Sequence, residues 1–557
     1  MSRFIVRPRT ADPAGHDWEL VDGPGVADGP LTVGGFTAVG EATVFNGAAL
    51  RRRLSPPAPE SCSDTELLVH VYDQHGLPGV AEADGMFAMV VSDGDDLVLL
   101  RDHVGARTLF YARAGGSWAA ASSLRALASW PALDTGLDVR AVRSFLTLAY
   151  LPGAETFFRG IREVGPGRCL RLRTDGDIDE SVLWEPVEAE DPLGADPGGS
   201  RLRELLEEAT IRRLPEAEPV GVLLSGGVDS SLVTALAAKF HDEPVTAYSI
   251  GFDSDTPNEL AYSGLVAAHC NVERRVLTVP GTSIAERMAE TVALLDCPVG
   301  DPLTVPNLLL AQEAARDGHS VILNGEGGDP VFGGPKNLPM LIFELMRDDP
   351  SVQARAAAYL SSYRKCLDDL PTLLSEDVLS ELEITAPSTE VLLPYLGPGQ
   401  MRSLLNKLLH TNLRTKGAHH ILTKVERLTA ASGVEGRAPL FDRAVIDHSF
   451  AIPPELKLHG TTEKWILKQS VRDLLPSTIV DRPKSGMRVP VQQWLDGPLR
   501  DLAHDVLLSG DADRGLFRRD TIRAWLRKDG SLLPRHGGKL WLVLTLELWL
   551  QSFEVGQ

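Results

Sequence analysis

Short apolar runs separated by turn residues fill the first third of the chain. Examples are FAMVVSD (87–93), LVLLRD (97–102) and RCLRLRT (168–174), with Gly, Pro and Asp standing between such runs. Runs of this length and punctuation are typical of β-strands joined by tight turns. The pattern predicts an antiparallel, layered domain over residues 1–185.

A different pattern begins after residue 200. The helix-period segment RLRELLEEATIRRL (201–214) is followed by the apolar runs VGVLLS (220–225), VTAYSIG (245–251) and HSVILN (319–324), with helical segments between them. Strands that alternate with helices favour a parallel, doubly wound sheet.

The two patterns are separated by residues 186–200, PVEAEDPLGADPGGS, which are acidic and rich in Pro and Gly and are interpreted as a linker. The second domain therefore covers residues 201–557. The last third of the chain, including segments 401–414 and 464–475, has almost wholly helical periodicity.

Bulk composition narrows the classes of function. The 557 residues carry a formal net charge of −21 and contain no long basic run, which argues against nucleic acid or anionic membrane as a partner. Five scattered cysteines form no CxxC pair, and the chain has neither a long apolar span nor a signal-peptide core. The prediction is a cytoplasmic protein.

The segment SGGVDSS (225–231) directly follows a predicted strand and opens a predicted helix. Glycines let the backbone approach a phosphate, and a helix N-terminus attracts anions. Asp229 would repel phosphates unless a metal lay between them, and Mg²⁺ favours carboxylates combined with phosphate oxygens. The alternative is a glycine turn in which Asp and Ser cap the helix.

A second glycine-rich turn, NGEGGDPVFGG (324–334), also follows a predicted strand. It would place Asp329 opposite Asp229 at one edge of the sheet, with Glu326 nearby, and so give Mg²⁺ two carboxylates. The alternative is a solvated acidic loop. Lys464, near the start of a predicted helix, could neutralise charge on an α-phosphate or could be a surface lysine.

These segments resemble the N-type ATP pyrophosphatases (SGG-x-DSS) and, together with KVERLTAASGVEGRAPLFD (424–442), the class B asparagine synthetase family. The resemblance implies a glutaminase-like β-sandwich of the Ntn-hydrolase type followed by an ATP-pyrophosphatase domain. It also implies roles for individual residues. Asp229 and Asp329 match the metal ligands, Glu326 and Lys464 match the catalytic residues, and the ATP-binding positions match Leu224, Ser225, Gly226, Gly227, Asp229, Ser230, Asn324, Gly325 and Lys484.

The closing stretch RPKSGMRVPVQQWL (482–495), which contains Lys484, also resembles the family. One departure is Pro330, where the family usually has an acid, so the shape of the second loop is an open question. The family's substrate pockets lead us to expect substrate contacts near residues 255–262 and 296–306 and in the helical last third.

The first domain also follows the family's glutaminase pattern, for example in RDHVGARTLFY (101–111). The family's nucleophile is a cysteine at position 2, but this chain has Ser2. Serine is the weaker nucleophile near neutral pH, although a free α-amine can activate a hydroxyl. We interpret the domain as a structural partner that has lost ammonia production.

The resulting hypothesis is an ATP- and Mg²⁺-dependent ligase of natural-product metabolism. It adenylates a small-molecule or peptide carboxylate, releases pyrophosphate and joins the acid to an amine without using glutamine. The alternatives are a lasso-type peptide macrocyclase, an ammonia-dependent asparagine synthetase and, in a different class, a nucleotide-binding pseudoenzyme or scaffold. GEGGD (325–329) argues against β-lactam formation, where the family branch has a tyrosine at the position of Glu326. A homodimer is common in the family.

Overall fold

The computed structural model describes residues 3–8, 16–21, 28–189, 199–254, 258–363, 365–383, 385, 388–484, 486–508, 514–529 and 538–553. The chain forms two compact units. Unit 1 comprises Met1–Asp138, Gly153–Pro186 and Gly417–Gly433, and unit 2 comprises Val139–Pro152, Val187–Lys416 and Val434–Gln557. Ser2 and most of the predicted linker lie outside the described residues.

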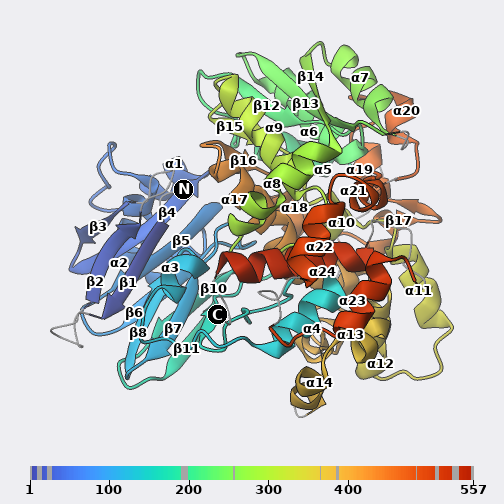
Figure 1. Cartoon of the computed structure of the whole chain (residues 1–557). Helices are drawn as coiled ribbons and strands as arrows, with labels where there is room; N and C mark the ends of the chain where they lie inside the picture. The colour runs from blue at the N-terminus through green and yellow to red at the C-terminus, as the bar shows by residue number, and fades with distance from the viewer. Residues whose placement is uncertain are drawn as a thin grey trace. The chain divides into compact units, whose positions relative to one another are not determined.

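Unit 1 is built on two antiparallel sheets (Figure 1). One has the order β2-β1-β8-β7-β9 and the other β11-β10-β6-β5-β4-β3. The strands are β1 (Arg3–Pro8), β2 (His16–Val21), β3 (Asp28–Val33), β4 (Phe36–Val44), β5 (Gly85–Ser92), β6 (Leu97–Arg101), β7 (Phe110–Ala114), β8 (Ser117–Ala121), β9 (Ile161–Glu163), β10 (Arg168–Leu172) and β11 (Ile178–Val182). The helices are α1 (Gly47–Arg51), α2 (Asp64–Val80), α3 (Leu124–Ala128) and α17 (Thr423–Ala430).

Strand β5 shows how alternation builds the core of unit 1. Ala88 and Val90 pack in an apolar cluster that contains Phe4 of the other sheet, whereas Met89 and Val91 pack in a second cluster with residues of α2. Successive side chains of a strand point to opposite faces, so β5 is buried on both sides. The predicted strands at 87–93, 97–102 and 168–174 are confirmed as β5, β6 and β10.

The sequence-based domains are continuous, but the compact units exchange two segments. In unit 1, Arg107 forms an ion pair of 3.4 Å with Glu426 of α17, and Arg427 donates to the hydroxyl of Thr108. Arg427 also donates to the Ser122 carbonyl. All of the residues in these contacts are buried. The RDHVGARTLFY segment therefore binds α17, a contact between residues more than 300 positions apart.

Unit 2 contains a parallel five-stranded sheet in the order β14-β13-β12-β15-β16. The chain runs outward from β12 to β14 on one side and continues at β15 on the other, so the strand order reverses between β12 and β15. Ligands of doubly wound sheets bind at the carboxyl ends of strands at this switch point. The strands are β12 (Val220–Leu223), β13 (Val245–Phe252), β14 (Glu273–Val279), β15 (Val321–Leu323) and β16 (Glu435–Arg437).

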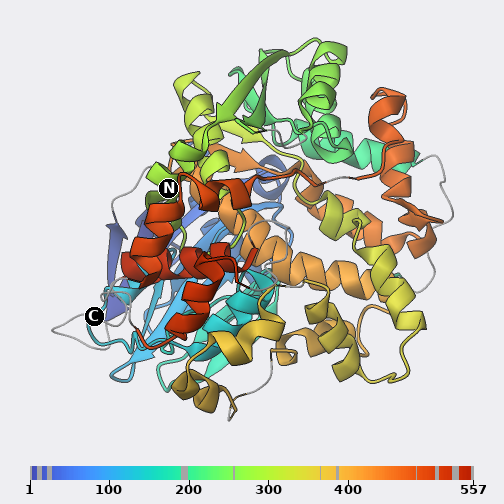
Figure 2. The same ribbon diagram turned by 45° about the vertical axis from the view of Figure 1, so that its right-hand side comes forward.

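Helices form the rest of unit 2, apart from the short hairpin β17 (Leu458–His459) and β18 (Thr462–Glu463). In Figure 2 most of the sheet is green, and most of the later helices are yellow to red. The helices of the sheet region are α5 (Ser200–Ile211), α6 (Val228–Phe240), α7 (Leu260–His269), α8 (Gly281–Ala293), α9 (Thr304–Arg316) and α10 (Gly328–Phe332). The others are α4 (Val139–Leu148), α11 (Asn337–Leu345), α12 (Val352–Ser361), α13 (Leu370–Leu373), α14 (Glu376–Glu383), α15 (Leu393–Leu396), α16 (Leu404–Asn412), α18 (Arg443–Ala451), α19 (Trp465–Ser470), α20 (Ser477–Val480), α21 (Val491–Asp496), α22 (Arg500–Leu508), α23 (Arg519–Leu526) and α24 (Gly538–Ser552).

The pairings confirm a mixed α/β chain with an antiparallel first unit and a parallel sheet in the second. The helix predicted at 464–475 is shorter, because α19 ends at Ser470 and Val471 leaves the helical region with φ −120°. Among the helices of the described residues, none combines the length and apolarity needed to cross a bilayer.

Lys457 in unit 2 gives a prediction about stability. Its ammonium is fully buried, donates to Asn406 Oδ1 at 2.6 Å, and burial lowers its pKa to about 7. The unfolded chain binds the proton more tightly, so Lys457 makes the folded state gain stability as pH rises from about 7 towards its usual pKa near 10.4. We expect Lys457→Met to reduce this pH dependence of the free energy of unfolding, measured by urea titration at pH 7 and 9.5. An unchanged slope would contradict the buried-lysine assignment.

Candidate functional site

The SGGVDSS segment forms a tight turn between β12 and α6. Ser230 Oγ lies 3.0 Å from Ser225 Oγ, accepts from the Ser225 amide and donates to the Gly227 carbonyl. Gly227 is the N-cap of α6 and its amide donates to Ser225 Oγ at 3.3 Å, whereas none of the described residues donates a backbone amide to the Asp229 carboxylate. The structure therefore does not support the alternative in which Asp229 serves as a helix cap.

Two glycines allow the turn to pack closely against its neighbours. Gly226 has φ +85°, and a Cβ there would lie 2.7 Å from the Ser263 amide nitrogen. Gly325, after β15, would place a Cβ 2.4 Å from the Ser230 amide nitrogen. The absence of side chains thus lets the loops after β12 and β15 approach each other at the switch point of the sheet.

Asn324 anchors the second loop. Its amide nitrogen and its side-chain Nδ2 both donate to the Arg437 carbonyl of β16, at 3.0 and 3.1 Å, and its Oδ1 accepts from the Glu326 amide at 3.0 Å. The 424–442 segment therefore contributes an edge strand that positions Asn324. Glu435 and Arg437 themselves form an ion pair of 2.6 Å.

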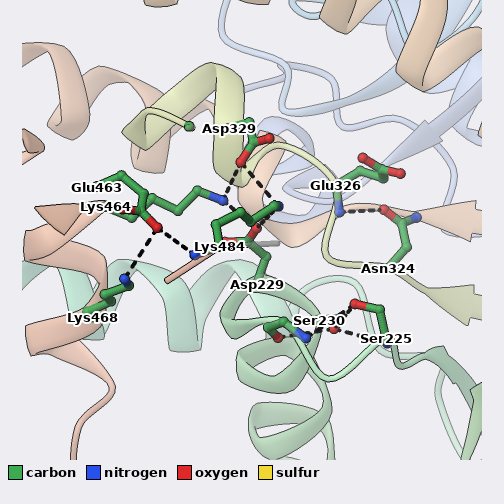
Figure 3. A network of polar contacts seen from close by, with 12 residues as sticks. Ser225, Asp229, Ser230, Asn324, Glu326, Asp329, Glu463, Lys464, Lys468 and Lys484 are labelled. Carbon is green, nitrogen blue, oxygen red and sulfur yellow. Dashed lines mark hydrogen bonds and ion pairs between the residues drawn. The ribbon is translucent and has the colours of Figure 1, made fainter. Parts of the chain in front are cut away.

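Two carboxylates and two ammonium groups meet where the loops end (Figure 3). Lys464 Nζ lies 2.5 Å from Asp229 Oδ2 and 2.6 Å from Asp329 Oδ1. Lys484 Nζ lies 3.3 and 3.2 Å from the same two oxygens. We call Asp229, Asp329, Lys464 and Lys484 the charge cluster. Asp329 is thus opposite Asp229, as predicted, and Lys464 is only 1% exposed and is not a surface lysine.

The cluster has the electrostatics of a cation site. Burial raises the pKa of Asp329, but the ammonium groups of Lys464 and Lys484 outweigh it and hold this pKa well below its usual range. Burial likewise opposes protonation of Lys484, yet the two aspartates raise its pKa. The Asp329 carboxylate is therefore ionised at neutral pH.

The carboxylates of Asp229 and Asp329 are also suited to bind a divalent ion that a phosphate ligand coordinates at the same time. One ammonium nitrogen reaches both of them, so one cation can do the same, and Asp229 Oδ1 is buried without a hydrogen-bond partner in the described part of the chain. No group of three or more His, Cys, Asp and Glu side chains with metal-site geometry occurs among the described residues. Two carboxylates completed by phosphate oxygens are the arrangement that Mg²⁺ prefers.

Lys464 is held in an unusual backbone conformation. It has φ +54° at the N-cap of α19, a left-handed conformation that costs a non-glycine residue about 1 kcal/mol. The Lys468 amide donates to the Lys464 carbonyl at 2.9 Å, and the Trp465 amide donates to the Lys457 carbonyl at 3.0 Å. Strain of this kind is found mainly where function needs a fixed side chain.

Pro330 does not distort the second loop. It is the third residue of α10, in the first turn, where an amide N–H would have no partner within the helix. Glu326 lies on the same loop but outside the charge cluster (Figure 3). None of the described residues forms a hydrogen bond or ion pair with its carboxylate, which is half-buried. The structure brings it near the site without fixing it.

Sequence reasoning missed several groups that support the cluster. Arg482 donates to the Gly226 carbonyl at 3.3 Å, pairs with Glu259 and lies 4.0 Å from the centre of the Tyr262 ring. Glu463 accepts from the Lys484 amide at 2.9 Å and lies 3.6 Å from Lys468 Nζ. Arg482 is the first residue of the RPKSGMRVPVQQWL segment, and Glu463 directly precedes Lys464, so the segments that contain Lys484 and Lys464 already marked the location of both residues.

The close approach of the two loops can be tested at Gly325. We expect Gly325→Ala to force the loops apart, because the new Cβ would meet backbone atoms that cannot move away. ATP binding measured by calorimetry should weaken by at least about 10-fold, and the free energy of unfolding should fall by about 1–3 kcal/mol. Gly538→Ala, where a Cβ meets nothing within 4 Å, is the matched control. Unchanged ATP binding in Gly325→Ala would contradict the described packing.

The chain is similar to known proteins over most of its length. The asparagine synthase family model matches residues 201–551, and a glutamine amidotransferase domain model matches residues 20–184. Glutamine-hydrolyzing asparagine synthetase 1 of Bacillus subtilis is 24% identical over 516 residues, which cover 87% of this chain and 80% of that protein. The carboxyethyl-arginine beta-lactam-synthase of Streptomyces clavuligerus is 26% identical over 477 residues, which cover 84% of this chain and 77% of that protein. Because the first model matches more than half of the residues, the chain belongs to the asparagine synthase family and is an ATP-dependent amide synthetase.

Proposed function

We propose that this synthetase uses ATP and Mg²⁺ to adenylate a substrate carboxylate, releases pyrophosphate and joins the acid to an amine without using glutamine. The observation that carries the proposal is the charge cluster at the switch point of the parallel sheet. Anionic phosphates and a substrate carboxylate are bound by cations and backbone N–H groups. The charge cluster and the adjacent N-terminus of α6 provide both.

Each part of the site has a role in this reaction. The backbone of Ser225–Gly227 and the N-terminus of α6 would bind the pyrophosphate part of ATP. Asp229 and Asp329 would hold a Mg²⁺ ion, which supplies charge neutralisation at the phosphates. Lys464, fixed by its left-handed backbone, would stabilise negative charge at the α-phosphate while the carboxylate attacks. Glu326, on the adjacent loop, would lie beside the activated acid and the incoming amine.

Glutamine independence is supported by the first domain. The position of the family's nucleophile holds Ser2, and the RDHVGARTLFY residues of unit 1 are engaged in holding α17 and in buried hydrogen bonds. Because these contacts stabilise the fold, the domain can be retained in the protein even without glutaminase activity. An amide synthetase that takes its amine ready-made is suited to joining the acids and amines of natural-product metabolism, and this is the role we propose.

Glutaminase activity is tested directly by measuring glutamate released from glutamine. We expect the intact chain and Ser2→Ala to release glutamate at the same background rate, because no cysteine nucleophile is present at position 2. Pyrophosphate release supported by a carboxylate and a free amine should also be the same in both proteins. Glutamate release that disappears in Ser2→Ala would contradict glutamine independence while leaving acid activation untouched.

A further inference from the structure

A large cavity in unit 2 adjoins the charge cluster. Its volume is about 1470 Å³, and Lys484, which contacts both aspartates, also lines it. The other lining residues come from α11, α12 and α16, from positions next to α11 and α12 such as Lys336 and Arg347, and from the segment 486–493, which runs into α21. These segments differ from the 255–262 and 296–306 loops expected from the sequence. Helix α16 and the segment 486–493 belong to the helical last third of the chain, as expected, whereas α11 and α12 precede it.

The lining is mostly apolar. It includes Met340 and Phe343 of α11, Tyr359 of α12, Leu408 of α16 and Val489. Phe343 is 56% exposed, and it is flanked by Ile342, Leu345 and Met346, which are 48%, 87% and 77% exposed. Large apolar side chains exposed together on one helix mark a surface that contacts an apolar partner. Figure 1 shows α11 at the margin of the helical part of unit 2.

Most of the charged side chains that line the cavity are positive. Five basic side chains line it, namely Lys336, Arg347, Arg355, Lys484 and Arg488, against the single carboxylate of Glu344. Glu344 Oε1 accepts from Arg355 Nη2 at 2.5 Å and from Arg347 Nη2 at 2.7 Å. This network ties α11 to α12, so the wall is preformed. Lys484 is paired with the two aspartates of the charge cluster, and the remaining lining still has more basic than acidic side chains.

Resting on the function proposed above, we infer that the cavity binds the acid substrate, and that this acid is a free carboxylic acid with a long apolar body. The apolar wall would take the body, and the basic residues would favour the carboxylate and direct it past Lys484 to the charge cluster. Ligand cavities of drug-sized molecules are about 300–1,000 Å³. A cavity of about 1470 Å³ is therefore larger than a compact amino acid such as aspartate requires.

Binding of model acids tests the inference. Calorimetry on the intact protein without ATP would compare dodecanoate, butanoate, L-aspartate and dodecylammonium below their micelle concentrations. Each buried CH₂ contributes about 0.8 kcal/mol, so even partial burial should make dodecanoate bind at least about 100-fold more tightly than butanoate. Dodecylammonium and L-aspartate should bind more weakly than dodecanoate by at least about 10-fold.

Two variants locate the binding. Phe343→Glu, at a half-exposed position that the fold does not depend on, should weaken dodecanoate by about 10-fold. Leu265→Glu, at a 40% exposed helical position on α7, should leave it unchanged. Tighter binding of aspartate than of dodecanoate, or equal loss in both variants, would overturn the inference. Because the calorimetry contains no ATP, its outcome is separate from whether the chain forms an adenylate, which pyrophosphate release measures.

Discussion

Asp229→Asn should abolish acid activation while the fold is kept. The substitution preserves the shape of the side chain but removes the charge that faces Lys464 and Lys484 and the buried oxygen assigned to Mg²⁺. Loss of one preorganised electrostatic group at a reaction centre costs about 100–1,000-fold, and loss of a metal ligand belongs at the upper end. We therefore expect the acid-dependent exchange of pyrophosphate into ATP to fall by about 1,000-fold.

The matched control for this variant is Glu290→Gln. Glu290 is an exposed carboxylate on α8 of the same unit, and it forms an ion pair with the neighbouring Arg287. The Glu290→Gln substitution also removes one negative charge from unit 2. This variant should retain the full rate of pyrophosphate exchange and the same thermal midpoint of unfolding. Exchange in Asp229→Asn at more than about a tenth of the normal rate would show that the aspartate is not a ligand of the catalytic metal.

Lys464→Gly is expected to have the second large effect. Glycine accepts the left-handed backbone at φ +54° without strain, so the turn into α19 should persist while the ammonium group is lost. Turnover should fall by about 1,000-fold, because Lys484 lies farther from the two carboxylates, at 3.3 and 3.2 Å, and should not take the place of the Lys464 ammonium at the α-phosphate. The KM for ATP should change by less than about 10-fold, since the backbone turn and Lys484 remain.

Two further variants distinguish the effect of the charge of Lys464 from the effect of its shape and position. Lys464→Arg retains the charge, but a planar guanidinium does not reproduce a compact ammonium that reaches two carboxylates at 2.5 and 2.6 Å, and we expect it to remain impaired. Lys239→Met removes an exposed lysine of α6 and should behave as the unaltered chain. A rise in the KM for ATP at constant turnover in Lys464→Gly would instead assign Lys464 to ground-state binding of the nucleotide.

The local hydrophobic pattern was sufficient to predict the elements whose side chains repeat with the period of a strand or a helix. The apolar runs that became β12, β13 and β15 are short, and each ends in turn residues, so their place in a parallel sheet followed from alternation with helices. The glycine-rich segments then located both loops. Because each loop follows the carboxyl end of a parallel strand, Asp229 and Asp329 were expected at one edge of the sheet. The pairing of these aspartates through Lys464 agrees with that prediction.

Features that depend on contacts between distant segments were not predicted. Segment 139–152 belongs to unit 2, where Leu148 and Tyr150 pack with Tyr359 and Leu408, and its hydrophobic pattern alone does not specify that partner. The assignment of α17 to unit 1 rests on buried ion pairs of residues that any helix surface could carry. Arg482 likewise depends on Tyr262 and Glu259, which are over 200 positions away.

The measurement that tests the central claim most directly follows the oxygen atoms of the carboxylate. An acid that supports turnover would be labelled with ¹⁸O in its carboxyl group, and the products formed with ATP, Mg²⁺ and an amine would be analysed by mass spectrometry. Adenylation at the charge cluster predicts one ¹⁸O atom in AMP and none in pyrophosphate. Label in inorganic phosphate together with ADP would show that the γ-phosphate is transferred instead, and would contradict the assignment of Asp229, Asp329 and Lys464 to cleavage between the α- and β-phosphates.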